Sequence, residues 1–167
     1  MKRVQSTSSG IYSPIMEYKE KASKQIEESP LPTGKEFILF VDDEPQIGNI
    51  VKDILEGLGY TVTTKSDSPK ALKLFQKDPF SFDLVITDIN MPNMTGDRLA
   101  LKLMEIRGNI PIIFCTGNKE LIPEDNAKIP GVKNYILKPF SIELLAETVR
   151  TVLDEGIKND PGHSNHT

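Results

Sequence analysis

The sequence contains one cysteine among 167 residues, Cys115, so an internal disulfide is excluded. Its position in the apolar run 112–115 indicates a small buried hydrophobe rather than a reactive thiol. Only two histidines are present, His163 and His166, and both lie in a polar tail. A zinc site built from several cysteine and histidine ligands is therefore not expected.

Long apolar runs are also missing, since none approaches the roughly 20 residues needed to cross a bilayer. The polar start of the chain lacks the apolar stretch of a signal peptide. We therefore expect a cytoplasmic protein without membrane contact. There is no excess of positive charge, because the formal net charge is −4. This balance predicts no nucleic-acid partner.

The composition that remains, 38% hydrophobic, is enough for one globular domain with some tail. Residues 1–35 are polar and end in a stretch with two prolines and a glycine, which predicts a linker or tail. We expect the domain over residues 36–155. Residues 156–167 are expected to form a flexible C-terminal tail.

Within the domain, apolar runs of strand length alternate with helical patterns. The expected strands are 37–41, 60–65, 84–87, 112–115 and 135–137. Helical spacing follows Pro45, Ser68 and Gly96, a short helix is expected around 123–128, and Ser141 is expected to cap a last helix. This alternation predicts an α/β fold, a doubly wound five-stranded parallel sheet with helices on both faces.

Polar side chains end four of the expected strands. Asp42 and Asp43 follow the first strand, Asp88 ends the third, Thr116 the fourth and Lys138 the fifth. Ligands of such sheets bind outside the carboxyl ends of the strands. If these four strands are neighbours, their terminal side chains converge at one edge of the sheet.

The residue types at this edge suit phosphoryl transfer. Three close carboxylates raise one another's pKa values unless a cation intervenes, and an oxygen-only ligand set selects Mg²⁺ or Mn²⁺. A carboxylate between a metal and a lysine can attack phosphorus while the cations neutralise the developing charge. The hydroxyl of Thr116 can then donate a hydrogen bond to a phosphoryl oxygen.

Each residue also has an ordinary explanation when it is taken alone. An aspartate after a strand is commonly a helix cap, Thr-Gly is an ordinary turn, and Lys-Pro is an ordinary start of a loop. These separate explanations do not account for the occurrence of the aspartates, the threonine and the lysine together at the ends of strands.

Four motifs together resemble the receiver domain of response regulators, over about residues 35–155. They are FVDDEP at 40–45, VITDINMP at 85–92 with TG at 95–96, CTG at 115–117, and YILKPF at 135–140. The resemblance implies a flavodoxin-like, receiver-type fold. It also implies that Asp88 is phosphorylated by a histidine kinase or a histidine phosphotransfer protein.

The same resemblance implies a metal site. Asp43 and Asp88 would bind Mg²⁺ directly, together with the backbone carbonyl of Asn90, and Asp42 would act through water. Manganese could replace magnesium.

The resemblance also implies a switch. Lys138 would bind the phosphoryl group, and the peptide bond to Pro139 would be cis. Thr116 would move toward the phosphate while Tyr135 turns inward, which changes the surface offered to a downstream partner that the sequence does not name.

Two alternatives stay open at this point. One is a docking domain that kept the fold without being phosphorylated, and the other is a Mg²⁺-dependent phosphatase with an aspartate nucleophile. The chain is expected to be a signalling domain, not an enzyme. It would be either a single-domain regulator or a piece of a larger protein such as a hybrid sensor histidine kinase.

Overall fold

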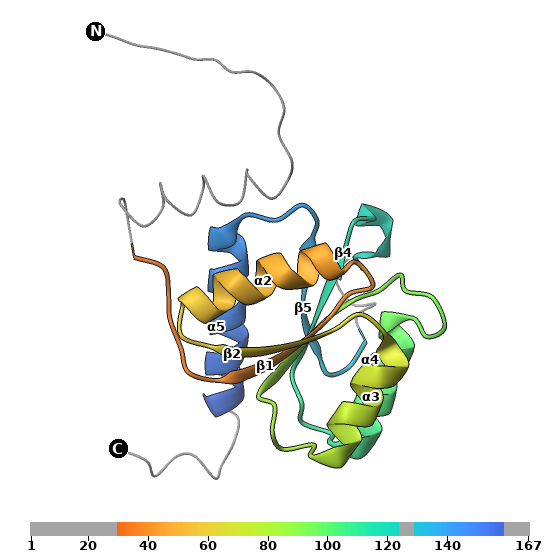
Figure 1. The fold of residues 1–167 in the computed structure, drawn as a ribbon. Coiled ribbons are helices and arrows are strands. Elements are labelled where there is room, and N and C mark those ends of the chain that lie inside the picture. The colour runs from red at the N-terminus through yellow and green to blue at the C-terminus, as the bar shows by residue number, and fades with distance from the viewer. Residues whose placement is uncertain (1–29, 124–128, 159–167) are drawn as a thin grey trace, which may run out of the picture.

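The computed structural model describes residues 30–123 and 129–158, and Figure 1 shows the course of the chain. In these ranges, strands and helices alternate along the sequence. In chain order they are β1 (Phe37–Val41), α2 (Pro45–Gly57), β2 (Thr61–Lys65), α3 (Ser68–Lys77), β3 (Leu84–Asp88), α4 (Gly96–Ile106), β4 (Ile112–Thr116), the 3₁₀ helix η1 (Lys119–Leu121), β5 (Val132–Leu137) and α5 (Ile142–Lys158).

The five strands form one parallel sheet in the order β2-β1-β3-β4-β5. The predicted doubly wound α/β fold is thereby confirmed. Strand order reverses beside β1, where ligands of such sheets bind. The register pairs Val41 with Thr87, so the residues that follow them, Asp42 and Asp88, reach the same edge at the same level.

Helices cover both faces of the sheet (Figure 1). Helices α2 and α5 pack on one face and α3 and α4 on the other, each pair closing its own hydrophobic cluster. Strand residues alternate between the clusters. In β1, for example, Ile38 and Phe40 contribute to the first cluster and Leu39 and Val41 to the second. Because both faces are buried, the central strands read as unbroken apolar runs in the sequence.

The helix starts follow local side-chain chemistry. Helix α2 begins with Pro45, whose missing N–H group costs nothing in a first turn. The Asp67 carboxylate caps α3 by accepting a hydrogen bond from the backbone N–H of Lys70, at 3.1 Å. At α5, the Ser141 hydroxyl oxygen accepts one from the N–H of Leu144, also at 3.1 Å.

Some boundaries differ from the prediction. Strand β5 begins at Val132 instead of residue 135, because the exposed Lys133 and Asn134 of this edge strand interrupt the apolar pattern. Helix α5 continues to Lys158, into the stretch expected to be tail. The short helix expected around 123–128 lies almost entirely outside the described residues. Among the residues described, no helix is long and apolar enough to span a bilayer.

Candidate functional site

Three aspartates meet at the carboxyl edge of the sheet. Asp42 follows β1, Asp43 comes next, and Asp88 ends β3. One carboxylate oxygen from each lies within 4.8 Å of those of the other two. Asp42 and Asp88 are almost completely buried, at 2% and 6% exposure, whereas Asp43 is exposed. The three acids that the sequence singled out therefore form one cluster with an open side.

Lys138, the residue that follows β5, brings a positive charge to this cluster. Its Nζ lies 2.8 Å from Oδ2 of Asp42 and 3.6 Å from Oδ2 of Asp88. The lysine is held at the edge by its own backbone, since its N–H donates a hydrogen bond to the carbonyl of Thr116, at 2.8 Å. The peptide bond between Lys138 and Pro139 is cis.

The cluster combines three carboxylates with one lysine, so its negative charge is not fully compensated. Burial raises the pKa of Asp88, and the charges of Asp42 and Asp43 raise it further, while Lys138 opposes the shift. Burial alone would lower the pKa of Lys138, but its hydrogen bond to Asp42 and the charges of Asp42 and Asp88 outweigh that and raise it. The lysine is therefore charged at neutral pH and only partly compensates the acids.

The donor set fits a hard divalent cation. Within the described residues, the cluster offers carboxylate oxygens and neither a histidine nor a cysteine. Oxygen ligands of this kind suit Mg²⁺ or Mn²⁺. Asn90, expected to contribute its carbonyl, follows β3 in the adjacent loop, where its side chain is exposed.

Thr116 ends β4, and Tyr135 lies on the adjacent strand β5, where it pairs with Phe114. Thr116 is fully buried at the end of β4, and its hydroxyl oxygen accepts a hydrogen bond from the N–H of Asn118, at 3.1 Å. The hydroxyl hydrogen is thus left to donate elsewhere. Tyr135 packs edge-to-face on Phe114, with ring centroids 5.5 Å apart. It is partly buried against the hydrophobic cluster under α3 and α4 and does not belong to the acidic cluster.

Several backbone groups also shape the site, and their roles were not predicted from the sequence. The N–H of Glu44 donates to Oδ1 of Asp42, at 2.9 Å. Gly96 opens α4 and donates its N–H to the carbonyl of Ile89, at 2.7 Å. A side chain at Gly96 would overlap the carbonyl of Asp88. The only sequence signal for this contact is a glycine at the start of a helix, where many residue types are tolerated.

Comparison of the sequence with known protein families agrees with this fold and this cluster of acids and lysine. The chain matches the family model of the response regulator receiver domain over residues 38–150. It belongs to the receiver domain family. This receiver domain therefore functions in two-component signalling, and the expected family resemblance is confirmed.

Curated relatives of the receiver domain include both regulators and kinases. This chain is 36% identical over 108 residues to the two-component response regulator ORR24 of Oryza sativa subsp. indica, and the match covers 65% of this chain and 17% of that protein. It is 31% identical over 113 residues to the sensor histidine kinase RcsC of Salmonella typhimurium, covering 68% of this chain and 12% of that protein. The chain thus spans less than a fifth of either relative.

Solved structures of receiver domains match it over nearly their full length. The receiver domain protein of Clostridium thermocellum aligns with a TM-score of 0.65 and 31% identity, covering 72% of this chain and 95% of that one. The receiver domain of the hybrid histidine kinase CckA aligns with a TM-score of 0.61 and 31% identity, covering 70% and 98%. The response regulator TrrA of Thermotoga maritima, in complex with Mg²⁺ and BeF, aligns with a TM-score of 0.63 and 31% identity, covering 70% and 98%.

Proposed function

We propose that Asp88 accepts a phosphoryl group in a Mg²⁺-dependent reaction. One observation carries this proposal, namely that the buried Asp88 carboxylate shares one cluster with two other acids and lies 3.6 Å from the ammonium group of Lys138. A buried carboxylate surrounded by acids and one lysine costs stability unless a cation joins it. Such a cost is expected at a functional site.

The chemistry follows from the groups at the edge. A carboxylate oxygen of Asp88 forms a bond to phosphorus while the P–N bond of a phosphohistidine donor breaks, and its electron pair returns to the imidazole nitrogen. The product is an acyl phosphate on Asp88. Lys138 stabilises the negative charge on the phosphoryl oxygens, and the Thr116 hydroxyl donates a hydrogen bond to one of them.

The metal ligands in this proposal are the carboxylates of Asp43 and Asp88 and the backbone carbonyl of Asn90, with Asp42 supporting the ion through water. When bound, Mg²⁺ or Mn²⁺ supplies positive charge that offsets both the acids and the transferring phosphoryl group. The donor chemistry of the acidic cluster supports this assignment.

The proposed donor is a histidine kinase or a histidine phosphotransfer protein. The likeness to the sensor kinase RcsC and to regulators such as ORR24 supports a partner of this kind. Phosphorylation would move Thr116 and Tyr135 and so change the surface that a downstream protein reads. In this proposal the chain acts in the cytoplasm as a phospho-acceptor and has no catalytic turnover of its own.

Intact mass measured after incubation with acetyl phosphate tests the proposal. The wild-type chain is expected to gain one phosphoryl group with MgCl₂ and none with EDTA. Asp88→Asn should gain none, and Asp53→Asn, which changes an exposed aspartate of α2, should behave like wild type. If no adduct forms and beryllofluoride does not bind either, the proposal is wrong and a docking domain is the better description.

A further inference from the structure

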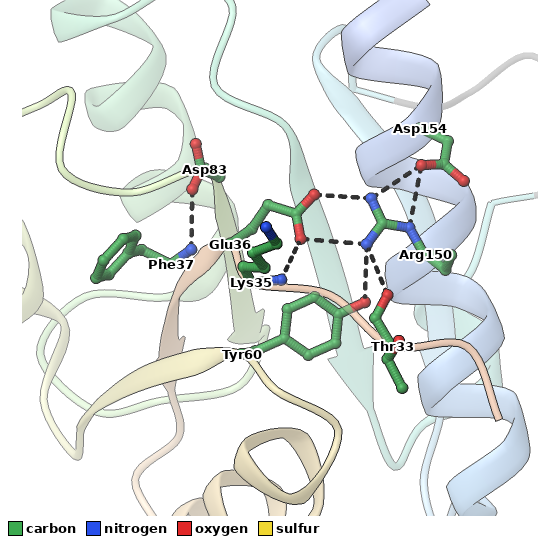
Figure 2. Close-up of polar contacts among 8 residues, drawn as sticks. All are labelled: Thr33, Lys35, Glu36, Phe37, Tyr60, Asp83, Arg150 and Asp154. Atoms are coloured by element: carbon green, nitrogen blue, oxygen red, sulfur yellow. Dashed lines mark hydrogen bonds and ion pairs between the residues drawn. The ribbon is translucent and has the colours of Figure 1, made fainter. Parts of the chain in front are cut away.

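The guanidinium group of Arg150 holds the segment that precedes β1 (Figure 2). This segment leads into the amino end of β1, whereas the acidic cluster lies at the carboxyl ends of β1 and β3. Nη2 of Arg150 lies 2.7 Å from Oε2 of Glu36, and its Nη1 donates to Oε1 of the same carboxylate, at 3.1 Å. The two bonds form a bidentate pair, the strongest geometry available to arginine and a carboxylate. Nη1 also donates to the backbone carbonyl of Thr33, at 3.0 Å.

Two further hydrogen bonds orient the guanidinium group of Arg150. Its Nε donates to Oδ1 of Asp154, one turn further along α5, at 3.0 Å. Its Nη1 also donates to the Tyr60 hydroxyl, at 3.3 Å. Helix α5, the turn before β2 and the chain before β1 are therefore tied together by a single side chain, which is only 19% exposed.

The backbone of the segment before β1 also packs closely against the rest of the domain. The N–H of Gly34 donates to the carbonyl of Leu58, at 3.1 Å. A side chain at Gly34 would overlap Tyr60 and Arg150, and one at Gly59 would overlap the carbonyl of Gly34. Gly59 also has a φ of +105°, which L-residues with a side chain rarely adopt. Two glycines are thus needed for the segment to approach the domain, which a freely moving linker would not require.

We propose that residues 33–36 form a rigid joint that couples the chain upstream of β1 to helix α5, with Arg150 as its positioning residue. Helix α5 runs from the side of the sheet where the strands end toward the side where they begin. It begins at Ile142, shortly after Lys138 of the acidic cluster, and carries Arg150 about two turns further on, at its midpoint. The signalling role of the joint rests on the proposed function. A phosphoryl group on Asp88 would attract the ammonium group of Lys138 more strongly, and a movement of Lys138 would be passed to the start of α5, four residues later.

A spin label on Pro30→Cys measures the joint directly. Residue 30 is exposed just upstream of it, and the native Cys115 will not compete for the label, because it is fully buried and burial raises its pKa to about 12. The label is expected to be restricted in the full-length chain and freely mobile with Arg150→Met. Exchange of the Gly34 amide should rise on the order of 10-fold with that substitution, as expected for a lost charge-assisted hydrogen bond.

Matched variants separate the joint from general stability. Asp154→Asn removes the negative charge that pairs with Arg150 on α5 but leaves the contacts of Arg150 with Thr33 and Glu36, so the label should stay restricted. Arg150→Lys keeps the charge without the bidentate geometry and should restore only part of the restriction. A second label on Lys70→Cys, exposed on α3, should report no change in any variant. If the Pro30 label is equally mobile in wild type and Arg150→Met, the joint does not exist.

Beryllofluoride and Mg²⁺ test the coupling in the same labelled chain, with binding verified by ¹⁹F NMR. A spectral change of the Pro30 label that requires Arg150 supports the proposal. Bound beryllofluoride without such a change in the wild-type background overturns the coupling. Failure of beryllofluoride to bind counts against the proposed function instead, and the comparison with Arg150→Met still decides whether the joint exists.

Discussion

Lys138 and Asp42 form a hydrogen-bonded ion pair, with 2.8 Å between Nζ and Oδ2. The proposed acceptor Asp88 lies further from the same ammonium group, at 3.6 Å. Without a metal, the lysine is therefore held mainly by an acid that takes no phosphoryl group. A cation bound at the cluster would weaken this pair and leave the lysine available to a phosphoryl group on Asp88.

Replacing this lysine should make folding stability depend on the metal. With EDTA present, Lys138→Met should lower the free energy of unfolding by about 1–3 kcal/mol, because Asp42 keeps a buried charge and loses its partner. Magnesium should recover most of this loss and bind the variant more tightly than wild type, because the competing ammonium group is gone. Urea denaturation with EDTA and with MgCl₂ measures both effects.

The control for this variant is Lys73→Met, which removes an exposed lysine from α3 and should change little in either buffer. An equal loss of stability for Lys138→Met with and without magnesium would contradict the idea that metal and lysine share one site.

Asp88→Asn should stabilise the metal-free protein at neutral pH. Burial raises the pKa of Asp88, so between its unfolded and folded pKa values the folded chain binds more protons than the unfolded chain. Stability is therefore lost as the pH rises through that window. The asparagine variant avoids this loss and should gain about 0.5–2 kcal/mol at pH 7. The difference should vanish below about pH 3.9, the unfolded value for aspartate.

Thermal unfolding across pH in EDTA measures this difference. In MgCl₂ the order should reverse, because the variant has lost a metal ligand. A variant that is less stable than wild type in EDTA at neutral pH would show that the Asp88 charge is well compensated by Lys138 alone.

The fold and the acidic cluster were predictable for one physical reason. Strands buried on both faces leave uninterrupted apolar runs, so the polar residue that ends each run is visible in the sequence. Asp42 and Asp88 stand at such ends, and Lys138 follows the shorter apolar run that closes the edge strand β5. Parallel strands then bring them to one edge without any further information.

Pairing between distant polar residues was not predictable in the same way. Glu36 and Arg150 are separated by 114 positions, and each reads as an ordinary solvated charge. Glu36 stands at the boundary of a stretch whose prolines and glycine suggested a linker, yet Gly34 serves a close backbone contact there. The preference of Lys138 for Asp42 over Asp88 likewise depends on distances that strand order alone does not determine.

Gly96→Ala should damage the site through the backbone. The added methyl group would overlap the carbonyl of Asp88, and moving that strand end or the start of α4 should cost about 1–3 kcal/mol. The rate of phosphorylation by acetyl phosphate should fall with it, because Asp88 is displaced. Gly57→Ala is the matched control, since a methyl group there meets nothing within 4 Å. That control should be neutral or slightly stabilising at the end of α2.

Glu36→Gln should remove a part of the stability that depends on pH. Burial alone would raise the pKa of Glu36, but hydrogen bonds and charge from Arg150, with backbone N–H groups, hold it below its usual value. A lowered folded-state pKa gives stability that is present above the unfolded value, about 4.3, and is lost as the pH falls through the folded value. Because the pair is partly exposed, the contribution should be at most about 1 kcal/mol at neutral pH and weaker at high salt. Urea denaturation from pH 3 to 7 on wild type, Glu36→Gln and the exposed control Glu105→Gln should show convergence of the first two only at the acid end. A constant difference across that range would mean that Glu36 contributes through packing and not through its charge.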